Sequence, residues 1–154
     1  MNSYFNFAGK VAIVTGGSTG IGRATALLFA RHGARVVIGD VNPEGRETVK
    51  TIEQEGGAAL FVETDVRNAR QVEDLVAAAL KTYGGLHVAF NNAGILPAGA
   101  LLADVEEAAF DQVVAVDLKG VFLAMKYEIQ HMLKAGGGAI VNNASITVMI
   151  AEAA

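Results

Sequence analysis

A glycine-rich segment near the N-terminus has the residue types and spacing to bind a phosphate. It follows an apolar run, precedes a helical pattern, and reads Thr15-Gly16-Gly17-Ser18-Thr19-Gly20-Ile21-Gly22. In a strand–loop–helix of this kind, a dinucleotide pyrophosphate rests on free N–H groups at the positive end of the helix dipole. Gly16 allows a sharp turn, Gly20 a close approach of backbone to pyrophosphate, and Gly22 close packing of helix on strand.

Two aspartates stand where ribose and base recognition would be expected. Asp40 follows the apolar run 35–39, twenty positions after Gly20, and Asp65 follows the run 59–62. The carboxyl ends of parallel strands line the ligand crevice, so Asp40 can accept hydrogen bonds from the adenosine ribose hydroxyls. The alternative is an ordinary turn aspartate.

The residues around Asp40 also predict the choice of cofactor. A carboxylate facing a 2′-phosphate is an unfavourable like-charge contact. Neither Thr19 nor Val41 is a Lys or Arg that could hold such a phosphate, and Arg23 lies within the expected helix. The sequence therefore predicts NAD(H) as the cofactor, in preference to NADP(H).

The hydropathy pattern supplies the elements that would position these residues. Strands are expected at 11–14, 35–39, 59–62, 86–90 and 139–143, and helices at 20–32, 43–55, 68–83 and 104–134, the last with a break. Such alternation predicts an α/β fold: a Rossmann-type doubly wound parallel sheet with helices on both faces, truncated after the fifth strand. Residues 1–154 are expected to form one NAD-binding domain, incomplete at its C-terminus.

The composition argues against several classes of binding partner. The net charge is −4 with no basic cluster, which argues against nucleic acid as the main partner. The chain has no cysteine and three scattered histidines, so no metal site is expected. No apolar run approaches the roughly 18 residues of a membrane span, and no signal peptide is visible, so a cytoplasmic location is expected.

The segment 113–133 is apolar on almost every side. A helix of this kind is covered on two sides. One side can lie on the sheet, and the other is expected to meet the same helix of a second subunit in a homo-oligomer, a dimer or tetramer.

Taken together, the motifs resemble the short-chain dehydrogenase/reductase family. They are the loop Thr15-Gly-x-x-x-Gly20-Ile21-Gly22, the acid Asp40, the pair Asp65-Val66, and the segment Asn91-Asn92-Ala93-Gly94. The resemblance covers essentially the whole chain, and stretches such as 89–92 and 122–127 look like members that act on cyclic secondary alcohols or diols.

The resemblance implies roles for individual residues. Asp65 and Val66 would hold the adenine, Asn92-Ala93-Gly94 would form the floor of the crevice, and Ile21 would donate a backbone N–H to the pyrophosphate. Ser145 falls at the catalytic serine, where its hydroxyl would orient the substrate oxygen; the alternative is a strand-end cap. The expected cofactor site thus comprises Gly16, Ser18, Thr19, Gly20, Ile21, Gly22, Asp40, Val41, Asp65, Val66, Asn92, Ala93 and Gly94.

The chain departs from the family pattern at two places. Asp117 stands where the family usually has Asn, which helps hold a helix irregularity and a water in a proton path; we expect Asp117 to keep an altered form of this catalytic role. The family's Tyr-x-x-x-Lys acid–base pair is absent, because Ala8, His87 and His131 lie four residues after the three tyrosines. Loss of the general acid–base typically costs about 10²–10⁴-fold in rate.

The predicted function is an NAD(H)-dependent oxidoreductase that interconverts a secondary alcohol and a ketone, with these 154 residues inactive by themselves. The alternative is a dinucleotide-binding module or scaffold without turnover. A Rossmann methyltransferase is a further candidate, disfavoured by the Gly16–Gly22 spacing and by Asn91-Asn92-Ala93-Gly94. A phosphate-loop NTPase would need Gly-Lys-Ser/Thr after the loop, which this sequence lacks.

Overall fold

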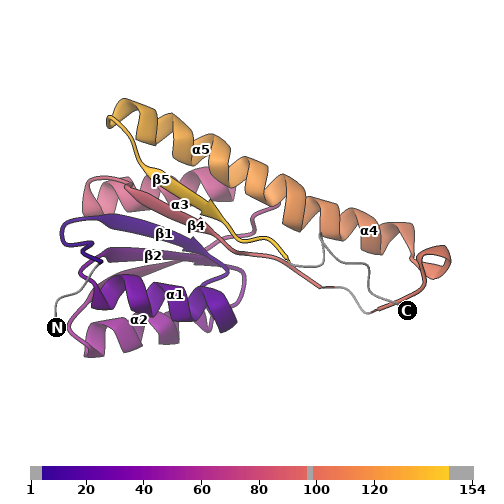
Figure 1. The fold of residues 1–154 in the computed structure, drawn as a ribbon, viewed down its shortest axis with the longest axis horizontal. Coiled ribbons are helices and arrows are strands. Elements are labelled where there is room, and N and C mark those ends of the chain that lie inside the picture. The colour runs from indigo at the N-terminus through magenta and orange to yellow at the C-terminus, as the bar shows by residue number, and fades with distance from the viewer. Residues whose placement is uncertain (1–4, 97–98, 146–154) are drawn as a thin grey trace.

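The computed structural model describes residues 5–96 and 99–145, in which strands and helices alternate (Figure 1). The strands are β1 (Val11–Thr15), β2 (Arg35–Asp40), β3 (Ala58–Glu63), β4 (Val88–Asn91) and β5 (Ala139–Asn142). The helices are α1 (Gly20–Arg31), α2 (Gly45–Gln54), α3 (Ala69–Tyr83), the 3₁₀ turn η1 (Leu102–Asp104), α4 (Glu107–Val113), the π-helical η2 (Val114–Gly120) and α5 (Val121–Lys134).

The five strands form one parallel sheet in the order β3-β2-β1-β4-β5. All five residues of β1 are buried, because the strand lies at the centre of the sheet and has helices on both faces. This arrangement confirms the predicted Rossmann-type α/β fold. The sheet places the carboxyl ends of β1, β2 and β4 along one edge, which is where a ligand crevice forms in such folds.

Alternate residues of β1 point to opposite faces of the sheet, as the period of a strand requires. Val11 and Ile13 pack in the cluster that contains residues of α3 and Met132 of α5. Ala12 and Val14 pack in the cluster that contains residues of α1 and α2. Figure 1 accordingly shows α1 and α2 below the sheet and α3 and α5 above it.

The second helix begins two residues later than the sequence predicts. We expected Pro43 at its first position, whereas α2 begins at Gly45. The side-chain oxygen of Asn42 accepts a hydrogen bond from the Glu44 N–H at 3.0 Å. Asn42 therefore closes a turn ahead of the helix and does not cap its first N–H groups. By contrast Asn68, the first residue of the range predicted for the third helix, caps α3, since its side chain accepts from the backbone N–H groups of Arg70 and Gln71.

The predicted break in the last long helix is a π-helical segment, η2, between α4 and α5. The helix itself begins at Glu107, three residues later than expected, after the separate turn η1. One face of α5 is buried through Leu123, Ala124, Glu128 and Met132. In Figure 1 the α4 end of this helix extends beyond the sheet.

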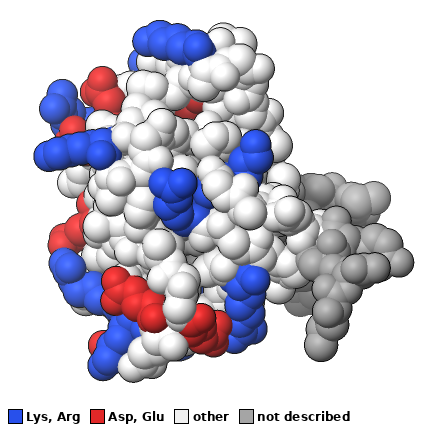
Figure 2. All heavy atoms as spheres, turned by 90° about the vertical axis from the view of Figure 1, so that its left-hand side faces the viewer, with Lys and Arg blue, Asp and Glu red and all other residues white. Residues whose placement is uncertain are grey.

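Charged side chains are dispersed over the face of the molecule shown in Figure 2. Among the described residues on this face, Lys and Arg are separated by uncharged residues and are interspersed with Asp and Glu. Within residues 5–96 and 99–145, no helix is both long and apolar enough to cross a membrane.

Candidate functional site

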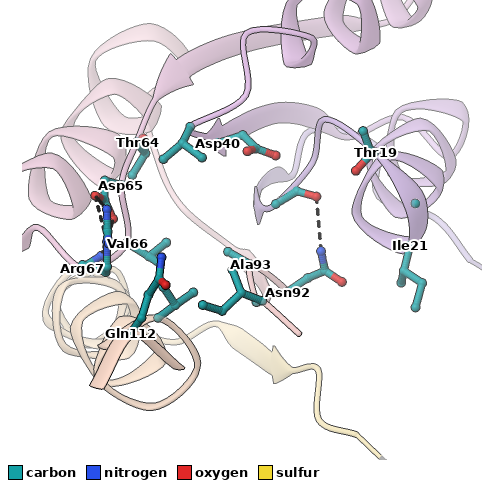
Figure 3. Close-up of a pocket in the computed structure, with 16 residues that line it drawn as sticks. Thr19, Ile21, Asp40, Thr64, Asp65, Val66, Arg67, Asn92, Ala93 and Gln112 are labelled. Atoms are coloured by element: carbon teal, nitrogen blue, oxygen red, sulfur yellow. Dashed lines mark hydrogen bonds and ion pairs between the residues drawn. The ribbon is translucent and has the colours of Figure 1, made fainter. Parts of the chain in front are cut away.

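A cavity of about 590 Å³ lies at the carboxyl ends of the central strands (Figure 3). It brings together eleven of the expected cofactor residues: Gly16, Thr19, Gly20, Ile21, Asp40, Val41, Asp65, Val66, Asn92, Ala93 and Gly94. The remaining lining residues are Thr64, Arg67, Ile95, Gln112 and Val116. Ser18, Gly22, Asp117 and Ser145 are not among the lining residues.

The glycine loop packs tightly against the end of β4. Gly16 has φ of +67°, and a Cβ built on Gly22 would lie 2.0 Å from the Gly16 carbonyl oxygen. No side chain fits at Gly22, so helix α1 can approach the loop only because this residue is glycine. A Cβ built on Gly20 meets none of the described residues within 4 Å, because this part of the loop faces the cavity.

The N-terminus of α1 retains hydrogen-bond donors for a ligand. Its N-cap is Thr19, whose side chain makes no capping hydrogen bond, and the first turn contains no acidic residue. The first N–H groups of a helix have no partner within the helix. Since Gly20 and Ile21 line the cavity, this end of α1 can bind an anion such as a pyrophosphate.

Asp40 is fixed between the glycine loop and the turn after β2. One carboxylate oxygen accepts the Ser18 N–H at 3.0 Å, and the other accepts the Asn42 N–H at 3.0 Å. The Ser18 hydroxyl donates to the Asn42 carbonyl oxygen at 2.8 Å, so this side chain supports the loop and does not line the cavity. A carboxylate has about four acceptor sites, so Asp40 retains acceptor capacity toward the cavity.

Asn92 and Thr15 join the ends of β4 and β1. The Asn92 side-chain amide donates to the Thr15 carbonyl oxygen at 3.1 Å and to the Gly16 carbonyl oxygen at 3.3 Å, the bond drawn in Figure 3. The Thr15 hydroxyl accepts the Asn92 and Ala93 N–H groups at 2.9 and 3.1 Å. Sequence reasoning assigned no role to Thr15, although its position at the end of a buried strand was visible. The pair holds the floor of the cavity in place.

Asp65 forms an ion pair at the rim of the cavity. Arg67 binds its carboxylate with a shortest N–O distance of 2.7 Å. This hydrogen bond is the main cause that lowers the pKa of Asp65. Sequence reasoning predicted Asp65 and missed Arg67, although a basic residue two positions after an acid in a turn is a readable signal.

Asp117 lies in the π-helical η2, at the position where the resemblance implies a helix irregularity. One of its carboxylate oxygens accepts the Ile95 N–H at 2.9 Å. Asp117 therefore holds the segment after Gly94, behind the cavity wall. Ser145 is exposed, three residues beyond the end of β5.

A buried carboxyl group connects α5 to the sheet. Glu128 is 1% exposed and accepts a hydrogen bond from the Asn91 side-chain amide at 3.0 Å, which also donates to Asn142. Burial raises the pKa of Glu128 to about 7. The Asn91 side-chain oxygen has no hydrogen-bond partner among residues 5–96 and 99–145. Sequence reasoning overlooked Glu128, although it is an isolated acid within an apolar helix.

The cavity also includes residues from the last long helix that the sequence did not reveal. Gln112 of α4 and Val116 of η2 form part of its wall. In Figure 3 Gln112 lies on the side away from Thr19 and Ile21 of the glycine loop. Within the part of the chain that the structure describes, no three His, Asp or Glu side chains are grouped to hold a metal ion.

Comparison with known proteins gives consistent results. The family model described as short chain dehydrogenase matches residues 10–153. An uncharacterized oxidoreductase of Thermotoga maritima is 45% identical over 91% of this chain and 55% of its own length. The cis-4-hydroxycyclohexanecarboxylate dehydrogenase of Sinomonas cyclohexanicum is 43% identical over 96% of this chain and 59% of its own length.

A solved structure shares the fold. The crystal structure of a short-chain type dehydrogenase/reductase from Mycobacterium marinum has a TM-score of 0.92 and 32% identity, and the match covers 96% of this chain and 60% of that chain. The present chain thus spans somewhat more than half the length of its relatives. The match of the family model over nearly all of the sequence shows that the chain belongs to the short-chain dehydrogenase family.

Proposed function

We propose that residues 1–154 form the NAD(H)-binding domain of an oxidoreductase that interconverts a secondary alcohol and a ketone. The observation that carries this proposal is the position of Asp40, a fixed carboxylate at the carboxyl end of β2, beside the uncapped end of α1. An anion site next to a hydrogen-bond acceptor matches a pyrophosphate joined to a ribose.

The cavity fits the adenosine half of a dinucleotide. Gly20 lines the cavity where a Cβ would stand in open space, so backbone and ligand can come close there. The residues beside β3, Asp65 and Val66, provide an acceptor and an apolar contact for a base. When bound, the nicotinamide would accept or supply the hydride.

The charges around the cavity favour NAD(H) over NADP(H). Asp40 would face the ribose hydroxyls, where a 2′-phosphate would be repelled. Arg67 is the only Lys or Arg among the described residues that line the cavity, and its guanidinium is bound to Asp65. Among the described lining residues, no cation is therefore available beside Asp40 to hold a 2′-phosphate.

The substrate proposed is a secondary alcohol or the matching ketone. The relative from Sinomonas cyclohexanicum is named for a hydroxycyclohexane compound, which supports a cyclic alcohol. Ser145 would hydrogen-bond the substrate oxygen and orient it. Asp117 would act through Ile95, whose N–H it accepts, to hold the segment after Gly94.

These 154 residues are proposed to bind the cofactor without efficient turnover. They contain no Tyr-x-x-x-Lys, so the phenol that would exchange the substrate proton is absent. The alternative, a dinucleotide-binding module without turnover in any form, shares the same site and differs only in what happens to the bound cofactor.

The proposal includes a homo-oligomer formed through the helical segment 113–133. Its face away from the sheet carries an apolar stripe that begins in η2 and continues along α5, with members 38–75% exposed: Leu118, Phe122, Ile129 and Leu133. The spacing of four, seven and four residues places them on one side of a helix. A two-fold axis would pair this stripe with its own copy and bury it.

A titration of the 154-residue chain with NADH, followed by calorimetry, tests the proposal. We expect saturable binding of one NADH per chain, no binding of S-adenosylmethionine, and no NADH formation from NAD with cyclohexanol. Binding of S-adenosylmethionine in place of NADH would identify a methyltransferase-like site and refute the proposal. Efficient turnover by this chain would refute the role assigned to the missing tyrosine and lysine.

A further inference from the structure

The ion pair between Asp65 and Arg67 is built into the wall of the cavity. The Arg67 Nε lies 2.9 Å from Asp65 Oδ1, and its Nη2 lies 2.7 Å from Oδ2. The backbone N–H of Arg67 also donates to Oδ1, at 3.0 Å. Figure 3 shows the pair at one end of the cavity, with Val66 and Gln112 beside it in this view.

The backbone of Asp65 is held as firmly as its side chain. Its N–H donates to the side-chain oxygen of Gln71 at 2.7 Å, and its carbonyl oxygen accepts the Asn68 N–H at 2.9 Å. Helix α3, which begins directly after Asn68, therefore anchors the turn. The carboxylate of Asp65 has one orientation because backbone, side chain and guanidinium are all fixed.

The carboxylate of Asp65 can accept about one more hydrogen bond than the protein donates to it. Three N–H groups of Arg67 donate to its carboxylate. An ionised carboxylate offers about four acceptor sites, so about one remains. Asp65 is half-buried and lines the cavity, which directs the remaining site toward a ligand.

We propose that Arg67 is a positioning residue that holds Asp65 so that its carboxylate accepts the 6-amino group of adenine and rejects a 6-oxo purine. This inference rests on the proposed NAD(H) site. A fixed carboxylate is only an acceptor, so it binds an amine, which donates, and repels a carbonyl oxygen, which accepts. Arg67 also lowers the pKa of Asp65, so the carboxylate stays ionised, and only an acceptor, further into the acidic range than an ordinary aspartate.

The test compares NADH with reduced nicotinamide hypoxanthine dinucleotide, which carries a 6-oxo group in place of the 6-amino group. We expect the chain to bind NADH about tenfold more tightly than the analogue, as a single lost hydrogen bond would give. In Arg67→Ala the preference should fall to about twofold, mainly through weaker NADH binding. Arg67→Lys should lie between, because an ammonium cannot bind both carboxylate oxygens in the same geometry.

Controls separate positioning from other effects. Arg70→Ala removes a neighbouring arginine that pairs with Glu73 and Asp74 and does not line the cavity, so the preference should stay about tenfold. In an Asp65→Asn background, Arg67→Ala should change the preference no further. Thermal melting of each variant verifies that it is folded.

Each result bears on one proposal. If Arg67→Ala weakens NADH and the analogue equally, Arg67 only contacts the cofactor, and the inference is wrong. Equal affinity of the unaltered chain for both dinucleotides would also overturn it, while the proposed NAD(H) site would stand. If the unaltered chain binds neither dinucleotide, the proposed function itself fails.

Discussion

The carboxylate of Asp40 accepts the backbone N–H of Ser18 at 3.0 Å, and this bond ties the end of β2 to the glycine loop. The two features expected to bind a dinucleotide, the acid and the loop, are thus one connected unit. Thr48 supports the same loop, since its hydroxyl donates to the Gly17 carbonyl oxygen at 3.2 Å. The proposed ribose and pyrophosphate sites are therefore joined by hydrogen bonds within the protein.

Gly22 and Gly20 should respond differently to alanine. In Gly22→Ala the new Cβ would lie 2.0 Å from the Gly16 carbonyl oxygen, so we expect a loss of about 3 kcal/mol of stability or more. In Gly20→Ala the new Cβ meets no residue of the part of the chain that the structure describes, and it strains only a residue with φ of +53°, which costs about 1 kcal/mol. Urea unfolding of both variants measures the difference. Equal losses would contradict the packing described for the loop.

Both glycine variants should bind NADH weakly, for separate reasons. Gly22→Ala destabilises the loop itself. Gly20→Ala places a methyl group where the cofactor would pass, while the fold remains. A folded Gly20→Ala protein that binds NADH as tightly as the unaltered chain would contradict the place proposed for the pyrophosphate.

Glu128 should make stability depend on pH between about 4.5 and 7. Because burial raises the pKa of Glu128 from 4.5 to about 7, the unfolded chain loses this proton first as the pH rises. The folded state therefore loses stability across this window, by at most about 3 kcal/mol, and the loss is complete above it. Glu128→Gln cannot ionise and should lack this loss.

The measurement is the free energy of unfolding of Glu128→Gln minus that of the unaltered chain, from pH 4 to 8. This difference should grow in favour of the variant as the pH rises. Glu55→Gln is the control, since Arg31 lowers the pKa of Glu55 and its contribution has the opposite sign. A difference for Glu128→Gln that does not change with pH would show that the buried group does not titrate as described.

The exposed apolar stripe predicts the oligomeric state. Phe122→Glu places a charge at the centre of the proposed subunit contact and should convert the oligomer into a monomer. Leu28→Glu is the matched control, because Leu28 is equally apolar and 55% exposed but lies on α1. Light scattering after gel filtration gives the masses. A monomeric unaltered chain, or an oligomer that survives Phe122→Glu, would contradict the contact.

Much of this architecture follows from local sequence. The strand at β1 is a run of apolar residues with a glycine loop behind it, and Asp40 follows the next run at a readable spacing, so both fold and crevice could be predicted. The start of α2 could not be predicted. In the sequence Asn42 and Pro43 resemble a cap and a first helical residue, whereas in the structure Asn42 closes a turn before the helix.

Contacts between distant segments were not readable from the sequence. Gln112 lines the same cavity as Asp65 and Val66, which lie more than 40 positions earlier, and the bond between Glu128 and Asn91 joins residues 37 positions apart. Asp65 and Arg67 are only two positions apart in the sequence, but the role proposed for the pair depends on the cavity that both residues line. These contacts arise from tertiary packing, so the sequence alone does not predict them.

The most direct test of the account is the ratio of NADH and NADPH affinities in the unaltered chain and in Asp40→Ala. We expect the unaltered chain to bind NADH at least tenfold more tightly than NADPH, because Asp40 repels a 2′-phosphate. In Asp40→Ala that ratio should collapse toward one, with weaker NADH binding. Tighter binding of NADPH by the unaltered chain, or a ratio that Asp40→Ala leaves unchanged, would contradict the central claim that Asp40 reads the adenosine ribose.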